Sequence, residues 1–198
     1  MAVGNGFANM TLVIQRTGDI DPYTTSLGVQ TTDPEGWDTT QMDTDSTAIA
    51  NAAKPNLTSL DTLSAIVWTV GTGTGALEYV SAVNAAGTLA SASAQMPQNC
   101  AILIQKRTST PGRRGRGRMY WPGLVESEVD GVGTILASAI TRVTTMLNSW
   151  KATFTSSPQL GQAVLFHEEG ATPAPGPSSI TQFSVSPILA TQRRRLRK

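Results

Sequence analysis

The stretch that organises the chain is residues 99–123, which read NCAILIQKRTSTPGRRGRGRMYWPG. Its first part holds a short continuous apolar run, Ala101 to Ile104, which is typical of a strand buried on both faces. Its second part alternates arginine with glycine, a residue that disfavours helix, and ends on aromatic residues. We therefore predict a buried strand, a basic connection and a second, aromatic strand. In an extended segment Arg114, Arg116 and Arg118 lie on one face and Arg113 on the other.

Short segments with β patterns lie on both sides of this stretch. Alternating or continuous apolar residues predict strands at 8–15, 23–31, 64–70, 77–83, 162–167 and 180–188. Many short strands with Gly and Pro turns favour an antiparallel sandwich of about seven or eight strands, jelly-roll-like in architecture. The expected fold class is therefore β-rich α+β.

One long helix is predicted over 134–154, because apolar residues recur there at three- and four-residue steps. Its expected buried stripe is Leu136, Ile140, Val143, Leu147 and Trp150. A shorter helix is predicted to begin at residue 45 or 46 and to end before Lys54-Pro55. The longer helix is long for a jelly-roll insertion, so a single antiparallel sheet with a helix layer is the alternative. No internal repeat of 20–50 residues is visible.

The composition favours protein–protein contact. Charged residues make up only 15% of the chain, against about 25% in typical domains. Residues 1–100 hold two bases and nine acids, a net charge of −7, whereas residues 101–198 hold thirteen bases and five acids, a net charge of +8. This asymmetry predicts pairing within or between subunits. We expect one β-rich domain over 1–190 and a basic C-terminal tail over 191–198.

Patterns for catalysis or cofactor binding are weak. The tract 71–76 has the spacing of a dinucleotide loop, but the residues after it predict a strand rather than the helix that such a loop must open. The single histidine, His167, and the single cysteine, Cys100, cannot form the usual zinc site, and no nucleophile elbow accompanies His167. The acidic residues in 126–130 fit a solvated turn better than a calcium site. We therefore expect no enzyme activity, no metal and no cofactor.

Two basic clusters are the candidate contact sites, since eleven of the fifteen bases fall within 106–118 and 193–198. The predicted contact residues are Arg113, Arg114, Arg116, Arg118, Arg193, Arg194, Arg195, Arg197 and Lys198. They either bind phosphate backbones through charge and counterion release, or clamp carboxylates on a neighbouring subunit. For the central cluster we favour protein contact, because a strand continues directly from it and the N-terminal half is acidic. Both interpretations stay open for the tail.

Two motifs carry a resemblance to a known family. The segment Gly115–Pro122 reads Gly-Arg-Gly-Arg-Met-Tyr-Trp-Pro, and Thr191–Arg195 reads Thr-Gln-Arg-Arg-Arg. This pair of motifs resembles a family of small virion proteins of bacteriophages, which share a central Gly-Arg-Gly-Arg-aromatic-Pro segment and a Thr-Gln-Arg-Arg-Arg ending. The resemblance implies a structural role in the virion.

The expected function follows from this resemblance. It is that of a structural protein of a bacteriophage particle, a minor capsid or decoration protein that stabilises the shell. A major coat protein, a head–tail or tail component, and a nucleic-acid-binding module are the alternatives. The expected partners are other copies of the chain, with a trimer favoured, and other virion proteins. Nucleic acid is a possible partner of the tail. No membrane partner is expected, because the chain holds no run of 18 apolar residues.

Overall fold

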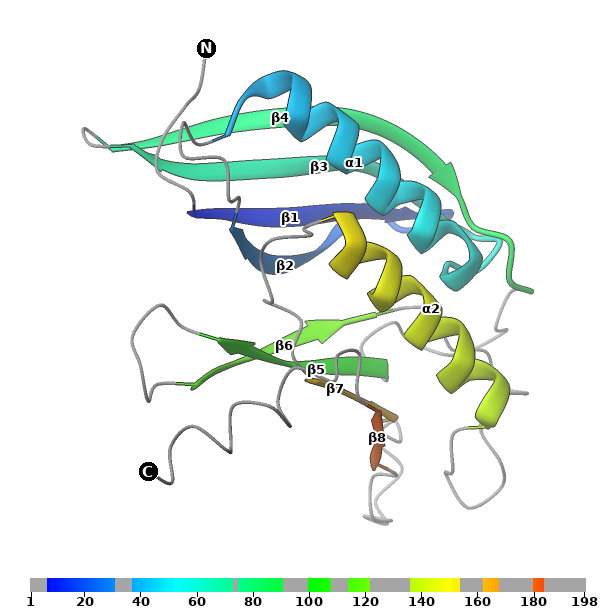
Figure 1. The fold of residues 1–198 in the computed structure, drawn as a ribbon. Helices are drawn as coiled ribbons and strands as arrows, with labels where there is room; N and C mark the ends of the chain where they lie inside the picture. The colour runs from blue at the N-terminus through cyan, green and yellow to red at the C-terminus, as the bar shows by residue number, and fades with distance from the viewer. Residues whose placement is uncertain are drawn as a thin grey trace, which may run out of the picture.

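The fold is α+β, with eight described strands, two α-helices and one 3-10 helix. The computed structural model describes residues 7–30, 37–72, 75–90, 100–107, 114–121, 136–153, 162–167 and 180–183. In chain order the elements are β1 (Phe7–Arg16), β2 (Tyr23–Gln30), α1 (Thr39–Ala53), η1 (Lys54–Asn56), β3 (Asp61–Thr72), β4 (Gly75–Ala86), β5 (Cys100–Arg107), β6 (Arg114–Tyr120), α2 (Ala137–Thr153), β7 (Gln162–His167) and β8 (Ile180–Phe183) (Figure 1). The β-rich α+β class is thereby confirmed.

The described strands form two four-stranded antiparallel sheets with one shared topology. The strand orders are β2-β1-β3-β4 and β6-β5-β7-β8. In each half of the chain two strands are followed by a helix and then by two more strands. Helices α1 and α2 pack against each other, and Figure 1 shows them running in opposite directions. The molecule is therefore built from two ββαββ units, residues 7–90 and 100–183.

This topology differs from the predicted jelly roll. A jelly roll is built from two Greek keys, in which the fourth strand returns to lie beside the first. Here the fourth strand of each unit lies beside the third, and each unit keeps its four strands in its own sheet. The jelly-roll architecture is not confirmed, and the antiparallel sheet with helices agrees better with the predicted alternative.

The first sheet has one buried face, because apolar and polar residues alternate along its strands. Met10, Leu12 and Ile14 of β1 are fully buried, while Asn9 is exposed. A strand shows each successive side chain to the opposite face, so this alternation gives the sheet one core face and one outer face. Helix α1 covers the core face over β3 and β4.

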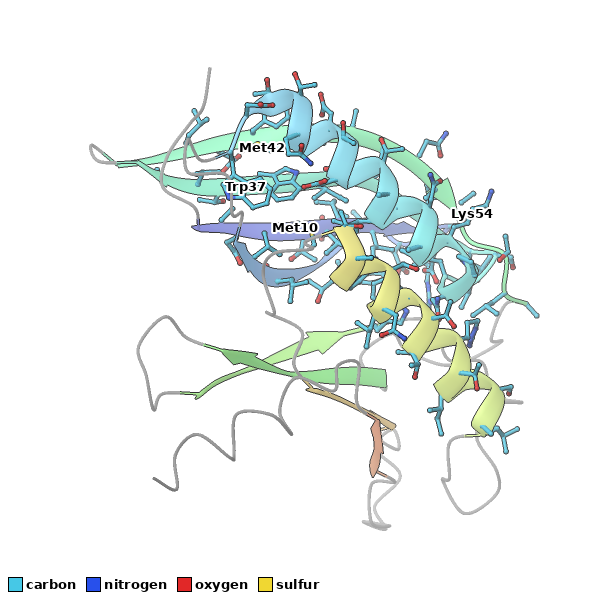
Figure 2. All side chains as sticks on the ribbon, in the orientation of Figure 1. Met10, Trp37, Met42 and Lys54 are labelled. Carbon is cyan, nitrogen blue, oxygen red and sulfur yellow. The ribbon has the colours of Figure 1, made fainter. Side chains whose placement is uncertain are left out.

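Two tryptophans fill the space between α1 and this sheet. The rings of Trp37 and Trp68 lie 5.1 Å apart at 46°, and Trp68 Nε1 donates to Ser46 Oγ at 2.8 Å. Figure 2 shows Met10, Trp37 and Met42 on the side of the sheet that α1 covers. All three are buried, so the core of this unit is continuous from sheet to helix.

Helix α1 begins earlier than the sequence pattern predicts. It starts at Thr39 rather than near residue 45, and Asp38 caps it by accepting a hydrogen bond from the Gln41 N–H at 2.7 Å. Threonine and aspartate have low helix propensity, so the capping residue and the burial of Met42 outweigh local preference here. The helix ends as predicted, at Lys54-Pro55, where η1 begins.

Helix α2 confirms most of the predicted stripe. Val143, Leu147 and Trp150 are fully buried, and Ile140 is half-buried against the core. Leu136 is 40% exposed, so its place in the stripe is wrong. It directly precedes the helix, whose first residue is Ala137, and therefore lies outside the helical repeat.

Candidate subunit interface

The central arginines lie on an edge strand. β6 pairs with β5 alone among the described strands, with Arg116 opposite Gln105 and Arg118 opposite Leu103. The predicted extended backbone is confirmed, so Arg114, Arg116 and Arg118 occupy alternate positions on one face of the strand. The other predicted contact residues, Arg113, Arg193, Arg194, Arg195, Arg197 and Lys198, lie outside the described residues.

The end of β6 is anchored in the core through Trp121. This side chain is fully buried, and its Nε1 donates to the backbone oxygen of Asn56 at 2.9 Å. Its ring meets the ring of Trp150 edge to face at 5.7 Å, and Trp150 Nε1 donates to the Ile49 backbone oxygen at 3.2 Å. The aromatic end of the Gly-Arg-Gly-Arg segment thus links the second unit to α1 and η1 of the first, and fixes the position of the basic strand. β6 also lies against β2 of the first unit.

The acids that we expect to pair with these arginines, in the same or an adjacent subunit, are Asp33, Glu35, Asp38, Asp43 and Asp45. Three of these five have other partners. Asp38 caps α1, and Asp45 accepts from Gln41 Nε2 at 2.7 Å. Asp43 accepts from Tyr79 Oη at 2.8 Å and from Ser81 Oγ at 2.7 Å. All three therefore have neutral donors within the first unit. The remaining two, Asp33 and Glu35, lie outside the described residues.

A highly connected polar cluster surrounds Asp61, and sequence reasoning missed it. Arg16 Nε and Nη2 bind the two Asp61 oxygens at 2.8 and 3.0 Å, and Tyr23 Oη donates at 3.1 Å. Thr58 adds its backbone N–H at 3.2 Å and its hydroxyl. Burial, followed by the Asp61 charge, raises the pKa of Tyr23. The Asp61 carboxylate is fully buried, and both of its oxygens accept hydrogen bonds. The cluster therefore joins the start of β3 to β1 and β2 rather than offering an acid or base to a ligand.

Asp45 is a second buried carboxyl, on the core side of α1. It is 5% exposed, and burial raises its pKa to about 6, although the hydrogen bond from Gln41 acts in the opposite direction. The sequence pattern did not indicate this burial, because we predicted that the helix begins at residue 45 or 46, whereas Asp45 lies within it. Asp45 is thus a stability determinant.

The structure also places some of the residues that the sequence analysis considered for cofactor binding, metal binding or catalysis. Thr72 pairs with Gly75, so the glycine tract joins β3 to β4 as a hairpin, as predicted, and opens no helix. The register brings Cys100 opposite His167, a pairing across 67 positions of sequence that spacing alone does not reveal. The acidic turn at 126–130 lies outside the described residues.

Neither a metal cluster nor a membrane span is found in the described part of the chain. It holds no group of three or more His, Cys, Asp or Glu side chains suited to a metal ion. Within the same ranges, neither helix has the length and apolar character needed to cross a bilayer. Comparisons with protein-family models, curated proteins and solved structures found no match to this chain.

Proposed function

We propose that the chain is a structural protein of a bacteriophage particle, a minor capsid or decoration protein that stabilises the shell through contacts between subunits. The observation that carries the proposal is the basic segment of β6. It is an edge strand with arginine at alternate positions, and Trp121, the residue that follows it, is held in the core, so the basic segment forms one border of the second sheet. The resemblance of this segment and of the basic ending to small virion proteins gives the proposal its biological context.

The charge distribution supports contact between copies of the chain. The first unit is acidic and the second basic, and a low total of charged residues leaves surfaces that associate readily. A head-to-tail arrangement, in which β6 of one copy meets the acidic surface of the next, closes into a ring when the rotation fits. We propose a trimer as that ring. A face-to-face sandwich of the two sheets also remains a prediction.

Nucleic-acid binding is the second candidate. Eleven of the fifteen bases lie in two segments, and arginine suits phosphate as well as carboxylate. A major coat, head–tail or tail role is the third, and it differs from the first in copy number within purified particles.

Arg116→Ala separates the first two candidates. If Arg116 contacts a neighbouring subunit, the variant assembles or enters particles less efficiently than the parent protein, because an acid on the neighbouring copy loses its partner. Its affinity for DNA changes little with respect to the parent protein. Lys54→Ala, at an exposed base of η1, is the matched control and retains assembly.

The contrary result has a distinct signature. Intact assembly, together with a salt dependence of DNA binding reduced by roughly one unit of slope, assigns the strand to phosphate contact instead. The measurements are particle incorporation by quantitative gel analysis and DNA affinity at several salt concentrations.

A further inference from the structure

The first sheet ends in a long strand whose outer edge no described residue pairs with. β4 spans twelve residues and, among the described strands, is hydrogen-bonded only to β3. Figure 1 shows it along the border of the sheet farthest from β2. The opposite border differs, because β2 lies against β6. β4 is therefore the border at which another strand can be added.

β4 lacks three of the features with which proteins protect such edges. These three are short length, proline and lysine; β4 is long, holds neither residue, and has Glu78 as its one charge. Its outer positions are all exposed: Ala76, Glu78, Val80, Ala82, Asn84 and Ala86. Val80 is 54% exposed, although its partner Val67 on β3 is half-buried. The β3–β4 register shifts at Leu63–Ala65, but the alternation along β4 continues through it.

The strand is complementary to an antiparallel copy of itself. A two-fold axis through Ser81 places residues on the exposed face of one β4 strand opposite residues on the exposed face of the other. An antiparallel ladder requires this, because directly opposed residues point to the same face of the sheet. The resulting pairs are Ala76 with Ala86, Leu77 with Ala85, Glu78 with Asn84, Tyr79 with Val83, and Val80 with Ala82. No like charges face each other, and the one carboxylate meets an amide that can donate to it. An axis through Glu78 would instead oppose two carboxylates.

We propose that β4 pairs with β4 of a second copy across a two-fold axis at Ser81, which joins two four-stranded sheets into one of eight strands. The contact is isologous and so differs from the head-to-tail contact proposed for β6. The contact between the two β4 strands is measured on the purified protein alone, so its test is independent of any role in a particle. An edge pairing of this length buries less than about 1,200 Å², and we expect a dissociation constant in the micromolar range.

Asp43 gives the interface a predictable dependence on salt. Its carboxylate is hydrogen-bonded to Ser81 and Tyr79, so the axis brings two Asp43 side chains to the same side of the joined sheet. Their repulsion opposes dimerisation and is screened by salt. We therefore expect the dimer to tighten as salt rises from about 50 to about 300 mM, and Asp43→Asn to tighten it at least several-fold at low salt. A misfolded variant would form a weaker dimer, so a tighter dimer in Asp43→Asn cannot result from misfolding.

Paired cysteines test the register. In a Cys100→Ala background, Glu78→Cys with Asn84→Cys puts thiols opposite each other across the axis, at a spacing that a disulfide spans. We expect a covalent dimer on a non-reducing gel under mild oxidation. The two thiols within one chain are roughly 20 Å apart along the strand and cannot bond to each other. Each single variant, and the shifted pair Ala76→Cys with Asn84→Cys, are the controls and should stay monomeric on the gel.

Val80→Lys tests the pairing without a disulfide cross-link. A lysine on the edge should weaken the dimer at least tenfold in analytical ultracentrifugation, while Thr24→Lys, at an exposed position of β2, should leave it unchanged. The proposal is overturned by a monomer at high micromolar concentration, by Val80→Lys without effect on the dimer, or by cross-linking of the shifted pair in preference to the 78–84 pair.

Discussion

At the residue scale, the ionisation of Asp45 contributes to the pH dependence of stability. Burial raises its pKa from 3.8 to about 6 in the folded chain, so between about pH 4 and pH 6 the folded state holds a proton that the unfolded state has released. The contribution of Asp45 is therefore most favourable below pH 4 and is lost as pH rises to 6, after which it is constant. At about 1.4 kcal/mol for each unit of pKa, the loss is at most about 3 kcal/mol.

Asp45→Asn should remove this dependence. The amide oxygen still accepts from Gln41, but no charge is buried, so the free energy of unfolding at pH 7.5 should rise by about 1–3 kcal/mol. Urea unfolding at pH 4, 5, 6 and 7.5 measures it, with Asp21→Asn at an exposed site as control. An Asn variant no more stable than the parent at pH 7.5 contradicts the assignment.

The Asp61 cluster shows why a polar network is hard to predict from residues alone. Arg16 and Asp61 are 45 positions apart, and neither lies in a charge pattern that singles it out. Their pairing depends on the register of β1 with β3, which opposes Arg16 to Asp61. The alternation of Met10, Leu12 and Ile14 predicts that β1 is a strand but not which strand lies beside it.

At the element scale, Leu147 tests the buried stripe of α2. It is fully buried among the core residues, so Leu147→Asp brings an uncompensated charge into the core and should unfold the chain or lower its stability by several kcal/mol, on the order of 3–5. Thr145→Asp is the matched control, because that side chain is exposed on the same helix. Circular dichroism during heating measures both. A Leu147→Asp protein that melts like the parent contradicts the buried stripe.

The sequence predicted the elements better than their ends. The hydrophobic period identified α2, and alternation identified β1 and β2, because these patterns reflect one buried face. The start of α1 was missed because residues 39–44 include three threonines and one aspartate, and only Met42 among the six is buried. Likewise the alternating arginines predicted an extended β6, but its position at a sheet edge depends on pairing that β5 and β7 decide.

At the scale of the whole molecule, the two ββαββ units share topology but not pattern. β1 alternates apolar and polar residues, while its counterpart β5 begins with a continuous apolar run. The first unit is acidic and the second basic. A repeat of about 90 residues with such different compositions leaves no periodic signal, which explains why it is invisible in the sequence.

Trp121 tests whether the two units unfold together. It follows the last residue of β6, yet its Nε1 binds the backbone of Asn56 and its ring packs on Trp150, which is itself bonded to Ile49 of α1. Trp121→Ala removes a large buried ring and leaves the Asn56 oxygen without this donor, so it should cost about 3–5 kcal/mol. Because the ring belongs to one core that both units build, the loss should appear in each unit.

Hydrogen exchange with mass spectrometry separates the units, since β1 and β5 give different peptides. In the parent protein both strands should exchange through the same global opening. In Trp121→Ala the protection of both should fall by a similar factor. Trp121→Phe keeps the aromatic contact with Trp150 but not the donor to Asn56. The protection of both strands in this variant should therefore lie between that of the parent protein and that of Trp121→Ala. Faster exchange in β5 with β1 unchanged would mean that the units are independent domains, joined only by the chain between them.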